Sequence, residues 1–289
     1  MTTIATQPSL PARAPVARPG RISLAGDLWR RRLIIGIVMI YAGLLIIAPI
    51  AALVTGAFAQ GLGAVVEALL QPEVLGAFWR TLYIALIILV VHTLFGTAVA
   101  WMLVRHKFPG RNWLNGLIDL PFAVSAVVVG YMLLLLFGRN SPLGPWLEAI
   151  NLKVAFAIPG MVLATLFVTL PFMIRELMPV LEEFGIEQEQ AAATLGANAW
   201  QTFWWVTFPA LRWGFIYGLT LTFARALGEF GAVLVIGGGV QGRTETATLY
   251  IFRALEERQY VGAYSAALVL GVFSLLLVLG TDWLRRREK

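Results

Sequence analysis

Residues 233–244, VLVIGGGVQGRT, carry the glycine spacing of two phosphate-binding patterns. The segment GGGVQG fits GxGxxG, the fingerprint of dinucleotide-binding loops, and GGGVQGRT departs by one residue from the nucleotide-binding pattern GxxxxGK[ST]. In the second pattern a Lys reaches the β and γ phosphates, and position 243 is Arg instead. An apolar run before a glycine loop is either a buried strand or the end of a membrane helix, so the spacing alone does not establish nucleotide binding.

A second candidate for chemistry is the pair Arg225 and Glu229 in the segment FARALGEFGA, which lies inside an apolar stretch. A spacing of four residues places both side chains on one face of a helix, where they can pair. Burying either charge alone in lipid costs at least roughly 2.5 kcal/mol on insertion scales. Both side chains are therefore expected to face the interior of a helix bundle or a water-filled cavity.

The remaining polar residues do not indicate catalysis. His92 stands alone in an apolar segment and is expected to pack rather than to relay protons, and Asp119 is expected to have a helix-end or snorkelling role. No HExxH or GxSxG pattern occurs, and no paired carboxylates lie where water and a substrate would meet. Because the sequence has no cysteine, a disulfide framework or thiolate metal site is excluded. We expect no catalytic residue, no metal site and no cofactor.

The composition indicates that these residues are positioned by membrane helices. Hydrophobic residues make up 59% of the 289 residues and charged residues only 13%, against roughly 25% charged in soluble domains. About 20 apolar residues span the hydrocarbon core as a helix. A cleaved signal peptide is the alternative for the first such segment, but its length favours a membrane helix. Six segments meet the test: 33–57, 81–104, 116–137, 154–174, 213–236 and 260–281.

The distribution of Lys and Arg predicts the orientation of these spans. Fifteen fall on the side of the two termini, six on the opposite side, and Arg225 lies inside a span. The positive-inside rule therefore places both termini in the cytoplasm. Anionic lipid and orientation explain the net charge of +6, so nucleic-acid binding is not expected. Residues 237–260 then lie outside the cytoplasm, where no ATP or NAD pool exists.

The longest cytoplasmic loop, residues 175–212, is half polar and half apolar. Its segment EEFGIEQEQAAATLG predicts a helix that Gly196 ends in a left-handed turn, and Pro209 is expected to mark the boundary with the fifth span. Two interpretations are open from composition: a compact docking element for another protein, or an interfacial hairpin with its Trp residues in the headgroup layer.

The sequence QAAATLGANAWQTFWWVTFP resembles the EAAxxxGx(9)IxLP signature of the membrane subunits of ATP-binding-cassette importers. Three positions differ conservatively, since Gln190 replaces Glu, Val206 replaces Ile and Phe208 replaces Leu. Glu189 lies one residue away, about 100° around a helix, which puts the family's Glu contact in doubt. The residues at the seven defined positions are Gln190, Ala191, Ala192, Gly196, Val206, Phe208 and Pro209.

The resemblance extends from about residue 30 to residue 284. The segments IDLPFAVSAVVVGYMLLLLFGRNSPLG, PGMVLATLFVTLPFMIREL and FARALGEFGAVLVIGG are similar to sulfate/thiosulfate permeases, with molybdate permeases as near relatives. GEFGAV and NSPLG resemble the W-type membrane subunit more than its T-type partner.

This resemblance implies a permease that works with two ATP-binding subunits, a T-type paralogous permease and an external sulfate/thiosulfate-binding protein in the bacterial cytoplasmic membrane. ATP would be hydrolysed on the partner subunits, and the loop's short helix would couple that hydrolysis to alternating access. Molybdate or tungstate is the alternative substrate, and an ATPase-independent secondary transporter is the rival mechanism. For the charged pair, either Arg225 helps to pass an oxyanion while Glu229 holds or resets it, or the two form a permanent ion pair that fixes packing.

The expected fold is an all-α integral membrane protein with six transmembrane helices, the type I importer domain with a cytoplasmic coupling helix. Residues 1–20 are expected to form a disordered cytoplasmic tail, and residues 21–75 an interfacial segment, the first span and an external loop. Residues 76–284 would form the five-helix core with the coupling loop 175–212, and residues 285–289 a basic cytoplasmic tail.

Overall fold

The computed structural model describes residues 24–287, which fold into helices and contain no strand. The expected tail at residues 1–20 lies outside the described residues. By its contacts the chain divides into two units, Met1–Ala51 and Ala52–Lys289. The helices are α1 (Leu24–Ala57), α2 (Leu62–Leu69), α3 (Pro72–Val91), the π-helix η1 (His92–Gly96), α4 (Thr97–Arg105), α5 (Arg111–Ala123), α6 (Ala126–Phe137), α7 (Gly144–Ala149), α8 (Ile158–Phe184), α9 (Glu187–Thr194), α10 (Ala199–Thr202), the π-helix η2 (Phe203–Thr207), α11 (Phe208–Leu227), α12 (Gly231–Gly237), α13 (Ala247–Glu256) and α14 (Tyr260–Arg287).

Within residues 24–287, four continuous helical stretches are long and apolar enough to cross a membrane, and six if each of two bent helix pairs counts as one span. A helix that is apolar on all sides suits lipid, and residues 29–57 of α1 have this character. The other three continuous stretches are Pro72–Arg105, Ile158–Phe184 and Tyr260–Arg287.

The third and fifth predicted spans are not single straight helices. Between α5 and α6 the chain bends by 113°, and between α11 and α12 it bends by 55°. Extended backbone at Val124 and Ser125 ends α5 and begins α6. The apolar composition predicted that each segment is long enough to span, but composition carries no information on direction. The direction of α6 is instead associated with its packing against α12 and α8.

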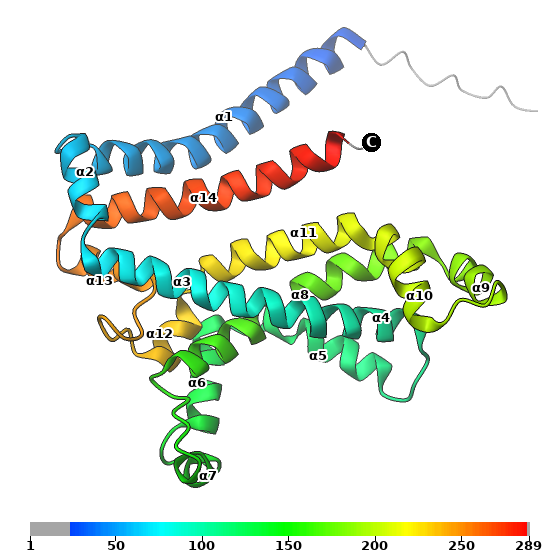
Figure 1. Ribbon diagram of the computed structural model, residues 1–289. Helices are drawn as coiled ribbons and strands as arrows, with labels where there is room; N and C mark the ends of the chain where they lie inside the picture. Colours follow the sequence, from blue (N-terminus) through cyan, green and yellow to red (C-terminus); the bar gives the residue numbers. More distant parts are fainter. Residues whose placement is uncertain (1–23, 288–289) are drawn as a thin grey trace, which may run out of the picture. The chain divides into compact units, whose positions relative to one another are not determined.

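Helix α8 is the centre of unit Ala52–Lys289. It packs against α3, α4, α5, α6, α11 and α12, and half of its most apolar window is buried. Small residues allow close approach, as membrane helix interfaces require. At Gly218 of α11, an added Cβ would lie 2.8 Å from Met173 Sδ of α8. In Figure 1, α9 and α10 lie at one end of the helix layer, and α12 and α13 lie at the opposite end.

Two π-helical turns interrupt the long helices. The first, His92–Gly96, joins α3 to α4, and the second, Phe203–Thr207, joins α10 to α11. Pro209 was expected to mark the boundary with the fifth span, and it lies in the first turn of α11, which begins at Phe208 and where a Pro is favoured. The π-turn ends at Thr207, and through it the helical run continues from Ala199 to Leu227.

Substitution of Gly130 in α6 tests the packing that sets the direction of the third span. A Cβ at this position would lie 2.7 Å from the Ala232 oxygen and 2.8 Å from Val235 Cβ, both on α12. We expect Gly130→Ala to destabilise the protein by about 1–3 kcal/mol because backbone must move. Thermal unfolding of the purified protein measures this. Gly271→Ala is the matched control, since nothing lies within 4 Å of its Cβ position; an equal effect of both variants would contradict the packing argument.

Candidate functional site

The predicted coupling loop begins later than expected. Residues 175–184 continue α8, and Gly185 ends this helix at φ +70°, so the single helix predicted over 182–196 is two helices, α8 and α9. Gly196 follows α9 with φ +87°, which confirms the left-handed turn predicted there. Asn198 then begins α10 with a capping box, in which its side chain and that of Gln201 each accept a backbone N–H at 2.9 Å.

Glu189 fixes this segment to the helix layer. Its carboxylate lies 3.1 Å from Arg105 Nε, and its Oε1 accepts hydrogen bonds from Arg105 Nη2 at 3.2 Å and from the Thr207 hydroxyl at 2.9 Å. Arg105 also donates to the Leu181 carbonyl at 3.1 Å. These contacts connect α9 to α4, to the end of α8 and to η2. Sequence reasoning missed Arg105 and Thr207, because no pattern relates positions so far apart in the chain.

The signature residues next to Glu189 are mostly on the surface. Gln190, Ala191, Gly196 and Pro209 are exposed, whereas Ala192, Val206 and Phe208 are half-buried. Exposed aromatic side chains lie beside them on α10 and η2, with Trp200 70% and Trp205 81% accessible. The surface therefore offers small residues and aromatic rings together. Both interpretations of the loop, as a docking element and as an interfacial hairpin, remain predictions.

Arg225 and Glu229 form an ion pair at the break between α11 and α12. Arg225 Nη1 lies 2.8 Å from Glu229 Oε2; the Arg225 side chain is 34% exposed and the Glu229 side chain 2%. Glu229 also accepts the Ala232 N–H at 3.1 Å, at the start of α12. The two charges thus suit the helix dipoles, with a cation in the last turn of α11 and an anion at the N-terminus of α12.

The expected position of Glu229 on the same helix face as Arg225 is wrong, since α11 ends at Leu227. The pair forms nevertheless, because the break keeps the two side chains within reach. Non-helical backbone at membrane depth is tolerated only where protein or water satisfies it. Here the Thr248 hydroxyl of α13 donates to the Glu229 carbonyl at 2.7 Å.

A charged cluster fixes the segment that follows α12. The buried Glu245 accepts a hydrogen bond from Arg253 Nε at 2.6 Å, and Arg253 also pairs with Glu73 and Glu257 at 3.2 and 3.0 Å. Arg80 of α3 donates to the Glu245 carbonyl at 2.7 Å and to the Gly242 carbonyl at 3.2 Å. The cluster therefore ties the glycine-rich segment to α3 and α13.

Arg253→Gln is expected to lower the free energy of unfolding of the protein by about 3–5 kcal/mol, because the Glu245 side chain, 1% exposed, loses its cation. The hydrogen bond to Glu245 raises the pKa of Arg253, so its charge and its stabilising contribution persist until the pH rises through that raised pKa, far above neutrality. Thermal unfolding measured from pH 6 to 9 should show the same loss throughout. Arg243→Gln is the control on the same loop, where the side chain is exposed; a loss as large as that of Arg253→Gln would refute the assignment.

The glycine pattern does not have the surroundings of a nucleotide loop. Gly238, Gly239 and Gly242 adopt positive φ, and the Thr244 hydroxyl accepts the Val240 N–H and donates to the Gly237 carbonyl. The segment follows helix α12 rather than a strand, whereas both fingerprints require a strand before the loop. Its glycines serve a tight turn from one helix to the next.

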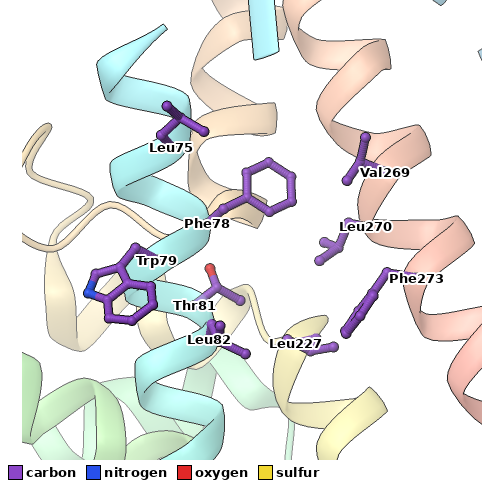
Figure 2. Close-up of a pocket in the computed structure, with 9 residues that line it drawn as sticks. All are labelled: Leu75, Phe78, Trp79, Thr81, Leu82, Leu227, Val269, Leu270 and Phe273. Carbon is purple, nitrogen blue, oxygen red and sulfur yellow. The ribbon is translucent and has the colours of Figure 1, made fainter. Parts of the chain in front are cut away.

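An apolar cavity of about 330 Å³ lies between α3, the end of α11 and α14 (Figure 2). The polar side-chain groups among its lining residues are the Trp79 indole N–H and the Thr81 hydroxyl, and that hydroxyl already donates to Ala77 and accepts from Ala247. This cavity offers no charge for an anion. It is therefore not a candidate for an oxyanion site.

The two remaining polar residues of the sequence analysis each have a partner on α8. His92 lies buried in η1, with Nε2 3.2 Å from the Thr169 hydroxyl of α8. Asp119 of α5 pairs with Arg175 of α8, whose Nη2 lies 2.6 Å from Oδ2. Arg175 was expected in a cytoplasmic loop, and its place within α8 is a correction.

An all-helical chain with broken spans and a surface segment fixed to its core is consistent with the class of membrane transport proteins. Residues 92–289 match the family described as binding-protein-dependent transport system inner membrane component, and the chain belongs to this family. Among its relatives, the sulfate transport system permease protein CysW of Synechococcus elongatus is 48% identical over 84% of this chain and 85% of the relative. CysW of Escherichia coli K12 is 44% identical over 86% and 85%, and CysT of the same strain is 38% identical over 88% and 91%.

A solved structure supports the same fold. The crystal structure of a bacterial ABC transporter involved in the import of the acidic polysaccharide alginate aligns with a TM-score of 0.74 at 19% identity, over 91% of this chain and 98% of that chain. The resemblance to W-type permeases and the type I importer fold expected from the sequence are thereby confirmed.

Proposed function

We propose that this chain is the W-type permease subunit of an ATP-driven importer that moves sulfate or thiosulfate across a bacterial cytoplasmic membrane. The observation that carries this proposal is the 44–48% identity to two CysW permeases over most of each chain. The higher identity to CysW than to CysT within one organism favours the W type and a T-type paralogue as the second membrane subunit. An external binding protein supplies the anion.

In the proposed cycle, two ATP-binding subunits contact α9 and hydrolyse ATP, so this chain itself needs no nucleotide. Movement of α9 passes to α4, α8 and η2 through the contacts of Glu189 and Arg105. The break between α11 and α12 then changes its exposure to either side. Arg225, partly exposed beside a buried carboxylate, presents a weakened positive charge, which lets an oxyanion pass without being held.

Both termini and the α9–α10 segment lie in the cytoplasm in this proposal, on the grounds of the Lys and Arg distribution. The glycine-rich segment and α13 then face the binding protein. Cysteine substitutions test the orientation, since the chain has no cysteine of its own. Pro109→Cys, exposed in the loop before α5, should resist a membrane-impermeant thiol reagent in intact cells and react in inverted vesicles; the reverse pattern would overturn the orientation.

Uptake of radiolabelled sulfate tests the substrate. In cells lacking this chain, the complementing gene should restore uptake, excess thiosulfate should compete, and excess molybdate should not. Equal competition by molybdate would instead support the alternative substrate. Purification of the chain without an associated ATP-binding subunit, together with uptake that persists in its absence, would contradict the ATP-driven mechanism.

A further inference from the structure

Two adjoining cavities open along α5, near the end of the unit Ala52–Lys289 that carries α9. They meet at Asn112 and Trp113, which line both. The first, of about 320 Å³, is lined by Lys107, Phe108, Gly110, Arg111, Asn112 and Trp113. The second, of about 380 Å³, is lined by Asn112, Trp113, Gly116, Leu117 and Leu120. We call the two together the α5 groove, which is basic at one end and apolar at the other.

The basic end carries two cationic side chains that have no acidic partner among the described residues. Lys107 is exposed and Arg111 is half-buried, and neither is in an ion pair with any other described residue. The neighbouring carboxylates are engaged elsewhere, since Asp119 pairs with Arg175 and Glu189 with Arg105. The positive end of the α5 dipole adds to the same potential.

The apolar end is one face of α5. Trp113, Gly116, Leu117 and Leu120 recur at helical spacing, with Trp113 86% and Leu117 58% exposed. The opposite face is buried at Ile118 and Pro121. Nothing lies within 4 Å of a Cβ added at Gly116, so the glycine leaves a depression in the middle of this face.

We propose that the α5 groove binds one anionic phospholipid, with its phosphate at Lys107 and Arg111 and an acyl chain along Gly116, Leu117 and Leu120. Clustered cations beside membrane helices attract anionic headgroups. Tryptophan prefers the boundary between headgroups and hydrocarbon, which is the position of Trp113 between the two ends. The eight residues from Trp113 to Leu120 span roughly 10 Å, which fits within one leaflet of a core about 30 Å thick.

The combination of a basic end and an apolar end distinguishes an anionic phospholipid from other ligands. A free phosphate would use the basic end and leave the apolar end empty, and a zwitterionic lipid would not match an uncompensated pair of cations. The inference is independent of the transported anion, because it involves none of the residues assigned to coupling or to the α11–α12 break.

The test uses the complex purified with its associated subunits and reconstituted in nanodiscs with phosphatidylglycerol or with phosphatidylcholine of the same acyl chains. Native mass spectrometry after mild detergent extraction counts the retained lipid, and titration gives its affinity. We expect Lys107→Gln with Arg111→Gln to weaken phosphatidylglycerol binding roughly 30-fold, about fivefold for each cation, and to leave phosphatidylcholine unaffected.

Gly116→Leu fills the depression and should abolish retention of phosphatidylglycerol without unfolding the protein, since the position is open. Gly271→Leu and Arg286→Gln are the matched controls on α14, an open glycine and an exposed cation, and should retain the lipid. Soluble glycerol phosphate should not displace the bound lipid.

Four results would overturn the proposal. Equal retention of the two lipids, or no effect of the double substitution, would exclude an anionic headgroup site. Displacement by glycerol phosphate as effective as by phosphatidylglycerol would make the groove a phosphate site without lipid. Loss of an associated subunit in Gly116→Leu would identify this face as a protein interface.

Discussion

We expect Arg225→Leu to reduce uptake at least about tenfold, the factor that 1.4 kcal/mol represents. The substitution leaves the Glu229 side chain, 2% exposed, without its cation, and breaking a buried pair in this way costs about 3–5 kcal/mol. Sulfate uptake in complemented cells measures the loss, and the amount of assembled complex in the membrane is recorded beside it.

The double variant Arg225→Leu with Glu229→Gln separates the two interpretations of this pair. Neutral Gln can still accept the Ala232 N–H, so the break between α11 and α12 stays capped and assembly should recover. If Arg225 serves the anion, uptake stays low although the complex is assembled. Recovery of uptake together with assembly would show that the pair has a packing role alone. Glu229→Gln by itself, which leaves an unneutralised Arg225, should slow release of the anion.

Glu189→Gln uncouples ATP hydrolysis from uptake, with uptake per ATP hydrolysed falling roughly fivefold or more. The pair with Arg105 is nearly buried, with side chains 17% and 8% exposed, and charged hydrogen bonds of this kind contribute about 1.5–3 kcal/mol each. Gln can still accept the Thr207 hydroxyl, but it loses the charged pair with Arg105, so α9 is held more weakly to α4 and its displacement by an ATP-binding subunit is passed less effectively to the membrane helices. Vesicles that contain the whole importer and its binding protein give both rates.

Gln190→Ala is the matched control, because Gln190 is the exposed neighbour of Glu189 on α9. It should leave the ratio of uptake to hydrolysis unchanged, because it keeps the contacts of Glu189 with Arg105 and Thr207. Arg105→Gln should reproduce the effect of Glu189→Gln, and the double variant should be no worse than either single variant. An unchanged ratio in Glu189→Gln would refute the assignment of Glu189 to transmission.

Much of this protein follows from its sequence because membrane insertion is a matter of length and composition. Stretches such as 33–57 and 260–281 are apolar for longer than the hydrocarbon core is thick, so their helical state is determined before any tertiary contact forms. The turn at Gly196 was equally predictable, since the residue's lack of a Cβ permits the positive φ that ends α9.

The sequence also indicated that Arg225 and Glu229 pair, because lone charges in lipid are costly. The predicted geometry was wrong, because α11 ends at Leu227 with Gly228 as its C-cap, whereas the apolar run had been interpreted as one continuous helix. The bend of 113° between α5 and α6 was likewise unpredictable, because an apolar run has the same composition whether it is straight or broken.

The sequence by itself determined which segments are membrane helices and that two charges lie among them, because the cost of exposing polar groups to lipid acts on each residue separately. The tertiary structure alone decided that Glu189 is held by Arg105 and Thr207, that Asp119 is held by Arg175, and that α6 leaves the direction of α5. These features depend on the close approach of positions far apart in the chain, and the helices bring them together through side-chain packing around α8.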